Sequence, residues 1–386
     1  MRRVLFVLSL SVAACLVALT PTRADEKSSS KIYGPDQKQW DAVADNAIKY
    51  LKGAQDDNGG WSTKQSPGVT GLVVTGLLQT GKVNDKDPNV ERGLKYIEGL
   101  INTDEGHIAG KGSVAVQLQN YVTAVNVLAL TTANRDSYKP VVKDAVAFLK
   151  KLQWDDADGK TNAKTKQDDF FGGAGYDSKS RPDLSNTQFF VDAMVAAGVS
   201  KDDPALKNAL IFISRCQNLK SEFNDQPWAG KFNDGSFIYS AAAGGQSKAD
   251  DKDPVGYGSM TYAGIKSMIY CGVDKKDKRV EKAYEWIRKN YSVDANPGMP
   301  DARSQWGLYY YYHTMAKCLS VLGIDEVEDM DGKKHDWRAD ITSALAKRQK
   351  KDGSFLNEKA ERWMEGDPNI DTAYALMALS YCKPKK

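Results

Sequence analysis

The sequence predicts an all-α fold in which twelve helices form two concentric layers of six. An apolar helical stretch recurs six times along the 386 residues, and a more polar helix precedes each copy. Helix pairs with one apolar and one amphipathic member stack so that the apolar members contact their neighbours, which places them in an inner layer. The last apolar stretch, 371–382, has no polar capping helix after it. We therefore expect a closed ring of six helix-pair repeats.

Each apolar stretch begins with a threonine, or once a tyrosine, and stops eleven residues later. The openers are Thr70, Thr123, Thr187, Thr261, Tyr312 and Thr372, and the stops are Gly81, Asn134, Gly198, Gly272, Gly323 and Lys383. Glycine and asparagine commonly end a helix in the left-handed conformation. Six inner helices are expected between these positions.

The helices that precede these stretches carry apolar residues at i, i+3, i+4 and i+7 spacing, which is typical of a helix with one exposed face. They are expected at 44–55, 90–101, 142–153, 206–217, 280–291 and 338–349. The links from outer to inner helices are long, and all begin on one side of the ring. Long loops usually bind something or decorate a rim, so this face, at the N-termini of the inner helices, is expected to carry any site.

Residues 1–24 have the features of a signal peptide. Arg2 and Arg3 precede an apolar run over 4–19, and a small-x-small cleavage site lies at 22–24. We expect export to the periplasm or the extracellular space. An uncleaved membrane anchor is the alternative, because the apolar run is close to membrane-spanning length.

The chain is then expected to divide into a flexible N-terminal segment at 25–38 and a single helical domain at 39–386. Val12-Ala13-Ala14-Cys15 also resembles a lipoprotein box, which would anchor the chain through a lipid on Cys15. Membrane contact is expected only through the signal segment or this lipid.

Charge and cysteines exclude several kinds of partner. Removal of the first 24 residues takes away three arginines and no acid, so the formal net charge falls from +3 to 0. Neither a nucleic acid nor an acidic membrane is favoured as partner.

Four cysteines remain outside the signal segment and none lies in a short metal-binding spacing, so no metal or cofactor is expected. They permit two disulfides, but buried free thiols are preferred. They are Cys216, Cys271, Cys318 and Cys382.

Outer helices end in a glutamine followed by a glycine-aromatic turn. Clean copies run from Gln55 to Trp61 and from Gln349 to Phe355, and weaker copies follow Gln153 and Gln217. Such a glutamine can hydrogen-bond the free backbone groups of the turn, which the aromatic ring covers. Together with Thr-Ala-Tyr-Ala-Leu at 372–376, this spacing resembles the QW repeats of squalene-hopene cyclases and prenyltransferase β-subunits over roughly residues 40–384.

The resemblance implies an α6/α6 toroid with a central cavity for an isoprenoid or other apolar small molecule. Class II terpene cyclases protonate their substrate with the middle Asp of Asp-x-Asp-Asp-Thr-Ala at the start of an inner helix. The matching stretch here is Pro368-Asn369-Ile370-Asp371-Thr372-Ala373, in which only the last Asp remains and Ile370 takes the place of the donor. Cyclase activity therefore does not follow from the resemblance.

The prenyltransferase comparison gives no metal site. The segment around His313 and Cys318 looks like the one that bears the zinc-binding His of that family. The other two ligands would fall at Ser259 and Thr261, and neither residue type is a usual zinc ligand.

Two residues are candidates for proton transfer. Asp371 is placed to act as a general acid or ligand contact, and the alternative is that it caps its helix. His313 lies on an inner helix, and the alternative is a buried, hydrogen-bonded imidazole. A third pair, His335 and Asp336, is interpreted as a turn and cap, because adjacent residues do not face one another on a helix.

Aromatic residues are the expected lining of the cavity. Four consecutive tyrosines at 309–312 must point in several directions on a helix, so some face the centre. An aromatic-rich core is the alternative. The candidates are Trp306, Tyr309, Tyr310, Tyr312, Phe170, Phe171, Trp228, Tyr257, Tyr262 and Trp363.

The leading hypothesis is an exported toroid that binds an isoprenoid or other apolar ligand, with catalysis and oligomeric state left open. A polysaccharide-active toroid enzyme is the second hypothesis, and it requires two carboxylates that face one cleft at roughly 5–9.5 Å. Its candidate carboxylates are Asp168, Asp169, Asp301, Glu365 and Asp367. A non-catalytic scaffold is the third hypothesis.

Overall fold

The computed structural model describes residues 31–112, 117–156 and 168–385. The signal peptide and Cys15 lie outside these residues, so their predicted roles stay predictions. None of the described helices is long and apolar enough to cross a membrane.

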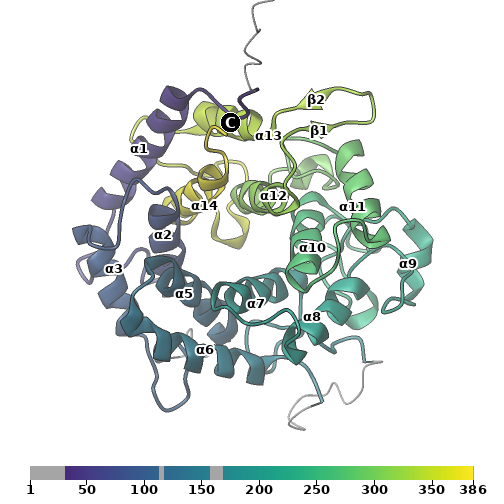
Figure 1. Ribbon diagram of the computed structural model, residues 1–386, viewed down its shortest axis with the longest axis horizontal. Coiled ribbons are helices and arrows are strands. Elements are labelled where there is room, and N and C mark those ends of the chain that lie inside the picture. The colour runs from purple at the N-terminus through teal and green to yellow at the C-terminus, as the bar shows by residue number, and fades with distance from the viewer. Residues whose placement is uncertain (1–30, 113–116, 157–167, 386) are drawn as a thin grey trace, which may run out of the picture.

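Six helices follow one another around the interior, and each contacts the next (Figure 1). The last of them contacts the first, so the inner layer closes on itself within the described chain. The all-α prediction is confirmed. These helices are α2 (Gly68–Gln79), α5 (Gln119–Ala133), α7 (Leu184–Ala196), α10 (Gly258–Tyr270), α12 (Leu308–Leu322) and α14 (Pro368–Tyr381).

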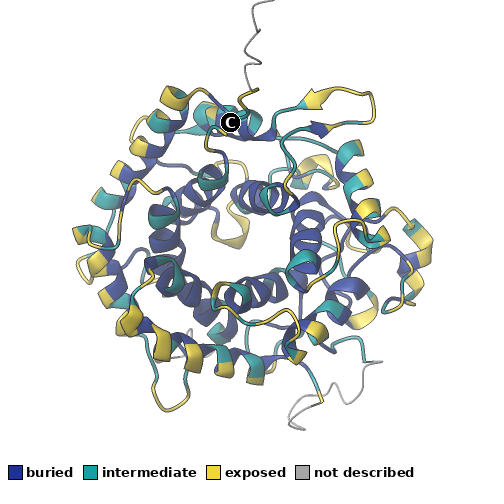
Figure 2. Cartoon of the chain, viewed as in Figure 1, coloured by how far each residue is buried: buried dark blue, intermediate teal, exposed yellow. Residues whose placement is uncertain are grey.

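A second set of helices packs outside the first, and Figure 2 shows exposed residues on their outward faces while the inner helices are buried. This is the distribution expected when amphipathic helices cover apolar ones. The outer helices are α1 (Gln37–Gly53), α3 (Pro88–Glu98), α6 (Lys139–Leu152), α8 (Pro204–Arg215), α11 (Lys278–Lys289) and α13 (Trp337–Arg348). A short helix, α9 (Pro227–Phe232), and a hairpin of β1 (Val327–Glu328) and β2 (Lys334–His335) lie in the connections.

Inner helices begin two to four residues before the threonine or tyrosine that was expected to open them. The C-terminal ends of the inner helices were predicted more accurately than their starts. Gly81, Asn134, Gly198, Gly272 and Gly323 all have positive φ angles, as a left-handed helix end requires. Lys383 does not follow this pattern, because α14 ends at Tyr381 with Cys382 as its cap.

The recurring threonine holds the preceding turn by a buried hydrogen bond. Its Oγ1 accepts a backbone N–H group from that turn in five of the six repeats, at 3.0–3.2 Å. A buried N–H group without an acceptor costs about 1–3 kcal/mol, so the threonine fixes where the turn meets the inner helix. The donor–acceptor pairs are Trp61–Thr70, Ile108–Thr123, Ala174–Thr187, Phe237–Thr261 and Phe355–Thr372.

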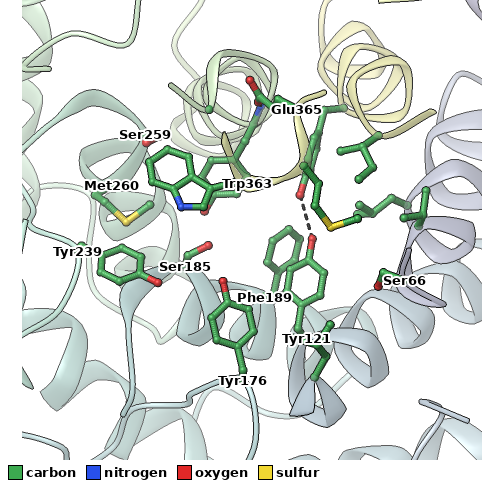
Figure 3. A pocket seen from close by; sticks show the side chains of 18 of the residues that line it. Ser66, Tyr121, Tyr176, Ser185, Phe189, Tyr239, Ser259, Met260, Trp363 and Glu365 are labelled. Atoms are coloured by element: carbon green, nitrogen blue, oxygen red, sulfur yellow. Dashed lines mark hydrogen bonds between the residues drawn. The ribbon is translucent and has the colours of Figure 1, made fainter. Parts of the chain in front are cut away.

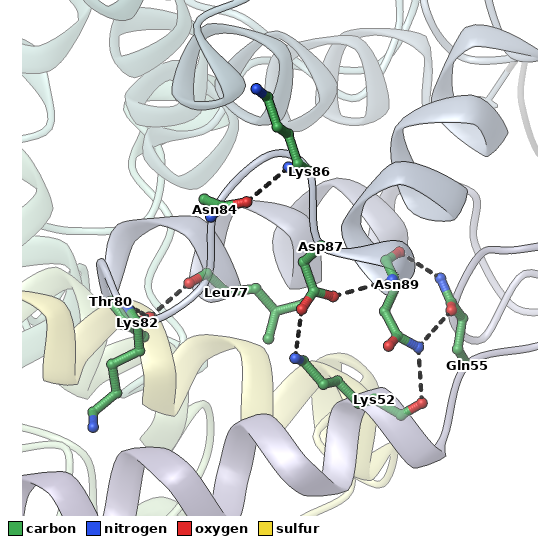
Figure 4. Close-up of polar contacts among 9 residues, drawn as sticks. All are labelled: Lys52, Gln55, Leu77, Thr80, Lys82, Asn84, Lys86, Asp87 and Asn89. Atoms are coloured by element: carbon green, nitrogen blue, oxygen red, sulfur yellow. Dashed lines mark hydrogen bonds and ion pairs between the residues drawn. The ribbon is translucent and has the colours of Figure 1, made fainter.

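The glutamine at the end of an outer helix joins that helix to the next one. Gln55 Nε2 donates to the carbonyl oxygen of Gly59 in its own turn at 2.8 Å. It also donates to the carbonyl oxygen of Asn89 in α3 at 2.8 Å (Figure 4). Gln153 and Gln217 make the same pair of bonds, to their turn and to α8 or α11. Gln349 donates to Gly353 at 3.1 Å and to Val43 of α1 at 2.9 Å, which connects the last outer helix to the first.

Glycine is required in these turns for two reasons. Gly59, Gly172, Gly235 and Gly353 have φ angles between 79° and 91°, and a Cβ at each would lie 1.8–2.7 Å from backbone atoms of the next outer helix. Both constraints exclude a side chain. The glutamine, the glycine and the threonine thus act on the same turn.

The four cysteines of the described chain are buried and free of disulfides. Burial raises the pKa of Cys271 and of Cys318 to about 12, so both side chains are neutral thiols at neutral pH.

Replacing Thr70 with valine keeps the shape of the side chain and removes the acceptor of the Trp61 N–H group. We expect Thr70→Val to lower the free energy of unfolding by about 1–3 kcal/mol, measured by urea denaturation. Thr70→Ser keeps the hydroxyl and is the matched control. If Thr70→Val lowers the free energy of unfolding no more than Thr70→Ser does, the hydrogen bond contributes nothing to stability.

Candidate functional site

A cavity of about 300 Å³ opens at the N-terminal ends of the inner helices, the end at which the sequence predicted a site (Figure 3). Each inner helix contributes a residue from its first turn, and Leu72, Phe189 and Tyr374 lie further along their helices. Loop residues complete the lining. The lining residues are Ser66, Val69, Leu72, Leu118, Tyr121, Tyr176, Ser185, Phe189, Tyr239, Tyr257, Ser259, Met260, Gly307, Tyr310, Trp363, Met364, Glu365, Ile370 and Tyr374.

Four aromatic rings from different inner helices form one wall of the pocket. Tyr121 and Tyr374 share a hydrogen bond between their hydroxyl groups at 3.0 Å, seen in Figure 3. Phe189 lies edge-on to Tyr121 with centroids 5.2 Å apart, and Tyr310 lies edge-on to Tyr374 at 5.7 Å. Edge-to-face contacts of this kind fix ring orientation, so the wall has a defined shape.

The loop before α14 brings a tryptophan and a carboxyl group to the pocket. Trp363 and Met364 have φ angles of 59° and 67°, a left-handed conformation that bulky residues seldom adopt. Such a residue costs about 1–3 kcal/mol and persists where its surroundings hold it. Trp363 packs edge-on against Trp306, with centroids 5.8 Å apart. The strained loop places the Trp363 indole at the mouth and Glu365 in the wall.

Glu365 and Asp371 form a buried carboxyl pair bridged by one asparagine. Glu365 Oε1 accepts the backbone N–H groups of Tyr309 at 2.9 Å and Tyr310 at 3.0 Å, at the start of α12. Asn357 donates its side-chain N–H to Glu365 Oε2 at 2.6 Å and its backbone N–H to Asp371 Oδ2 at 2.7 Å. Glu365 lines the pocket, and Asp371 lies behind it.

The pair retains a proton near neutral pH. Burial raises the pKa of Glu365 to about 7, against the effect of the N–H groups that favour its charged form. Burial and the charge of Glu365 raise the pKa of Asp371 to about 10. Two buried carboxyl groups that interact in this way disfavour each other's ionisation, so the pair keeps a proton near neutral pH, and the higher pKa is that of Asp371.

Three of the ten aromatic residues expected to line the cavity do so, namely Tyr257, Tyr310 and Trp363. Of the neighbouring residues on and before α12, Trp306 contacts Trp363 without lining the pocket. Tyr309 packs outward against Phe355, with centroids 5.7 Å apart.

The other five expected lining residues lie in the protein core, because their rings or polar atoms have partners there. Tyr262 packs against Tyr311, and the Tyr312 hydroxyl donates to the Val293 carbonyl at 2.6 Å. The Trp228 indole donates to the Arg215 carbonyl at 3.1 Å. Phe170 and Phe171 belong to a separate apolar cluster with Trp154.

The two candidates for proton transfer have different environments. Asp371 is not the cap of α14, because the helix begins earlier and Asp367 caps it by accepting the Asn369 N–H at 2.8 Å. His313 is 1% exposed and stacks on Tyr374 at 5.9 Å, outside the pocket lining. Burial lowers the pKa of His313 well below its ordinary value, so the imidazole is neutral.

The remaining polar candidates give no second centre. His335 contacts Asp329 at 2.9 Å, while Asp336 caps α13. In the parts of the chain that the structure describes, no group of three His, Cys, Asp or Glu side chains could hold a metal ion.

Sequence reasoning missed most of the pocket lining. Tyr121, Phe189 and Tyr374 each lie two residues from the threonine of their repeat, and Tyr310 lies two residues from Tyr312. That spacing was a usable signal. Tyr176 and Tyr239 come from long loops, and no periodicity marks them.

Comparison with known proteins supports the fold. A scan against protein-family models and a search of curated proteins find no match. Among solved structures, the type II terpene cyclase MstE from Scytonema is similar at 12% identity, with 89% of this chain and 98% of that chain covered and a TM-score of 0.53. A variant glycosidase in complex with glucose matches at 11% identity, 89% and 96% coverage and a TM-score of 0.52. A novel α-amylase from Clostridium perfringens matches at 13% identity, with 89% of this chain and 98% of that chain covered and a TM-score of 0.52. The chain has the fold of toroid-type enzymes.

The carboxyl pair makes stability depend on pH. A carboxyl group whose pKa is raised by folding stabilises the fold below its ordinary pKa, near 4, and this stability is lost as pH rises through the raised value. Each such group lowers the free energy of unfolding by up to about 1.4 kcal/mol per pH unit in that window. Asp371→Asn removes one such group. Its free energy of unfolding should therefore fall less between pH 5 and pH 7 than that of the wild type.

Urea denaturation at pH 5, 6 and 7 measures this slope. Burial also raises the pKa of Asp183, but that group is present in both proteins and cancels. The exposed Asp104→Asn is the matched control and should keep the wild-type slope. Equal slopes for Asp371→Asn and wild type would contradict a raised pKa at Asp371.

Proposed function

We propose that the chain is a six-repeat α6/α6 toroid of the squalene-cyclase and prenyltransferase type. It binds an isoprenoid or similar apolar molecule in the aromatic pocket and donates a proton to it from Glu365. The observation that carries this proposal is a pocket wall of aromatic and aliphatic side chains that contains one carboxyl group, Glu365, whose pKa burial raises to about 7. From the sequence alone, we also propose that the chain is exported.

The pocket favours an apolar ligand that gains positive charge. Apolar surface removed from water contributes roughly 25 cal/mol per Å², and the faces of tyrosine and tryptophan rings attract cations. The rings of Tyr310, Tyr374 and Trp363 all border the cavity. A carbon skeleton protonated there would be surrounded by ring faces.

Glu365 is held in a way that suits proton donation. When its proton passes to an alkene carbon or an oxygen of the ligand, Glu365 becomes a carboxylate. The N–H groups of Tyr309, Tyr310 and Asn357 already point at its oxygens and stabilise that charge. Glu365 would thus replace the donor that Ile370 cannot supply, from the loop five residues upstream.

A glycan-cleaving enzyme is the second candidate function. The solved structures support it equally, and the tryptophan pair at the mouth, Trp306 and Trp363, is a surface on which a sugar can stack. Glycoside hydrolysis needs two carboxyl groups that flank the scissile bond. Asp371 does not border the cavity, so we favour the apolar ligand. A scaffold role predicts a filled centre, which the pocket does not support.

Ligand binding tests the proposal. Isothermal titration of the full chain with geraniol, farnesol and squalene should detect binding of at least one of them. Ser185→Trp fills the pocket and should weaken that binding at least roughly tenfold by steric exclusion. Ser178→Trp, on an exposed loop, is the matched control.

Two results would contradict an isoprenoid site. One is the absence of binding to all three compounds, and the other is binding that Ser185→Trp leaves unchanged. Binding of malto-oligosaccharides with release of reducing sugar would favour the second candidate instead.

Proton donation is tested separately. Glu365→Gln keeps the size of the side chain and an oxygen for the Tyr309 and Tyr310 N–H groups. With a ligand that wild type converts, we expect similar binding but product formation slower by about 100-fold or more, followed by gas chromatography. The exposed Glu361→Gln, in the same loop, should convert the ligand normally. Unchanged turnover in Glu365→Gln would exclude Glu365 as donor.

A further inference from the structure

An amine, an amide and a carboxyl group meet between two inner helices, outside the pocket lining. Gln188 and Asp192 lie four residues apart on α7, so their side chains share one face of that helix. Lys266 of α10 reaches both, because its Nζ donates to Gln188 Oε1 and, at 2.7 Å, to Asp192 Oδ2. All three side chains are buried. The three groups are therefore held together away from water.

This cluster carries more positive than negative charge. Lys317 of α12 also forms an ion pair with Asp192 Oδ2, at 2.8 Å, so two ammonium groups share one carboxylate. His313, one turn before Lys317, adds no charge, because burial lowers its pKa well below the ordinary value. A buried charge without a counter-charge of its own is costly. Loss of the Lys266 charge would leave a matched pair of Lys317 and Asp192.

Lys266 is suited to act as a nucleophile. Burial lowers its pKa to about 8, and the charge of Lys317 acts in the same direction against that of Asp192. A desolvated lysine beside another cation yields its neutral amine readily, and the neutral amine is the form that attacks a carbonyl group. Gln188 Oε1 is bonded to Cδ, so the amine lies beside the carbon that it would attack.

The other two groups have atoms open to proton transfer. Gln188 Nε2 and Asp192 Oδ1 are buried and have no hydrogen-bond partner among the residues that the structure describes. Buried polar atoms normally have a partner. Here the amide nitrogen that would leave can accept a proton, and a carboxylate oxygen of the neighbouring side chain can carry one.

We propose that Lys266 and Gln188 join in an isopeptide bond, a covalent link between α7 and α10. Lys266 Nζ forms a bond to Gln188 Cδ, the bond from Cδ to Nε2 breaks, and ammonia leaves. Starting from the neutral amine, one amine proton passes through the Asp192 carboxylate to the departing nitrogen. The reaction needs no oxidant and no further reactant.

The link would restrain the inner layer in the way that disulfides restrain other proteins. It joins residues 78 positions apart in the sequence, and closing a long loop limits the freedom of the unfolded chain. The four cysteines of the described chain form no disulfide. This inference requires no ligand and is independent of the proposed function.

Intact-mass spectrometry of the purified full chain, unfolded in acid, tests the link. Counted from the N-terminus found in a peptide map, the mass should lie about 17 Da, one ammonia, below that of the sequence. A tryptic digest should contain a branched peptide that joins residues of α7 to Lys266, because trypsin does not cleave after a modified lysine.

Variants assign the loss of ammonia to this pair. Lys266→Met and Gln188→Leu should each restore the mass of the sequence, since each removes one of the joined groups. Lys317→Met is the matched control. It removes a lysine from the same cluster, keeps the three reacting groups and should still lose ammonia.

Three results would overturn the inference. The first is a wild-type chain with the full mass of its sequence, a result that does not depend on whether any variant folds. The second is a loss of about 18 Da with Lys266 joined to Asp192, since the group lost would be water and the acceptor the aspartate. The third is a loss of ammonia that persists in both Lys266→Met and Gln188→Leu.

Discussion

A buried hydrogen bond from a turn to a threonine hydroxyl is the contact on which the arrangement of this protein depends. It recurs in five of the repeats, and in four of those repeats a glutamine amide and a glycine act on the same turn. The threonine ties the turn to its own inner helix, and the glutamine ties it to the next outer helix. Because Gln349 reaches back to Val43, these contacts also connect the two ends of the outer layer.

These contacts decide where chemistry is available. They hold the start of each long loop at the N-terminal ends of the inner helices, where the loops supply Tyr239, Trp363 and Glu365 to one cavity. The inner helices supply the opposite wall and the N–H groups that Glu365 accepts. A carboxyl group that would be ionised in water therefore has its pKa raised to about 7 beside an apolar space, with cations at its entrance.

The sequence predicted the helical fold well because threonine, glutamine and glycine recur at a fixed spacing, and five of the predicted helix ends have the left-handed backbone they require. It predicted the site less well. Asp371 looked like a cap because the start of α14 was placed four residues too late, and Asp367 is the cap. The pKa of Glu365 depends on Asn357 and on the start of α12, which no local pattern brings together. The sequence also did not show which of the adjacent tyrosines lines the pocket. Tyr310 borders it, while Tyr309 packs outward.

Hydrogen exchange of turn amides, followed by NMR, tests the central claim that the threonine contacts hold the ring together. The N–H groups of Trp61, Ala174, Phe237 and Phe355 lie in turns rather than in helices, and each donates to a buried threonine. If these contacts carry the fold, the four amides exchange only through global unfolding, as slowly as amides in the inner helices. Exchange at the rate of exposed loop amides would show that the turns open independently, and would contradict the account.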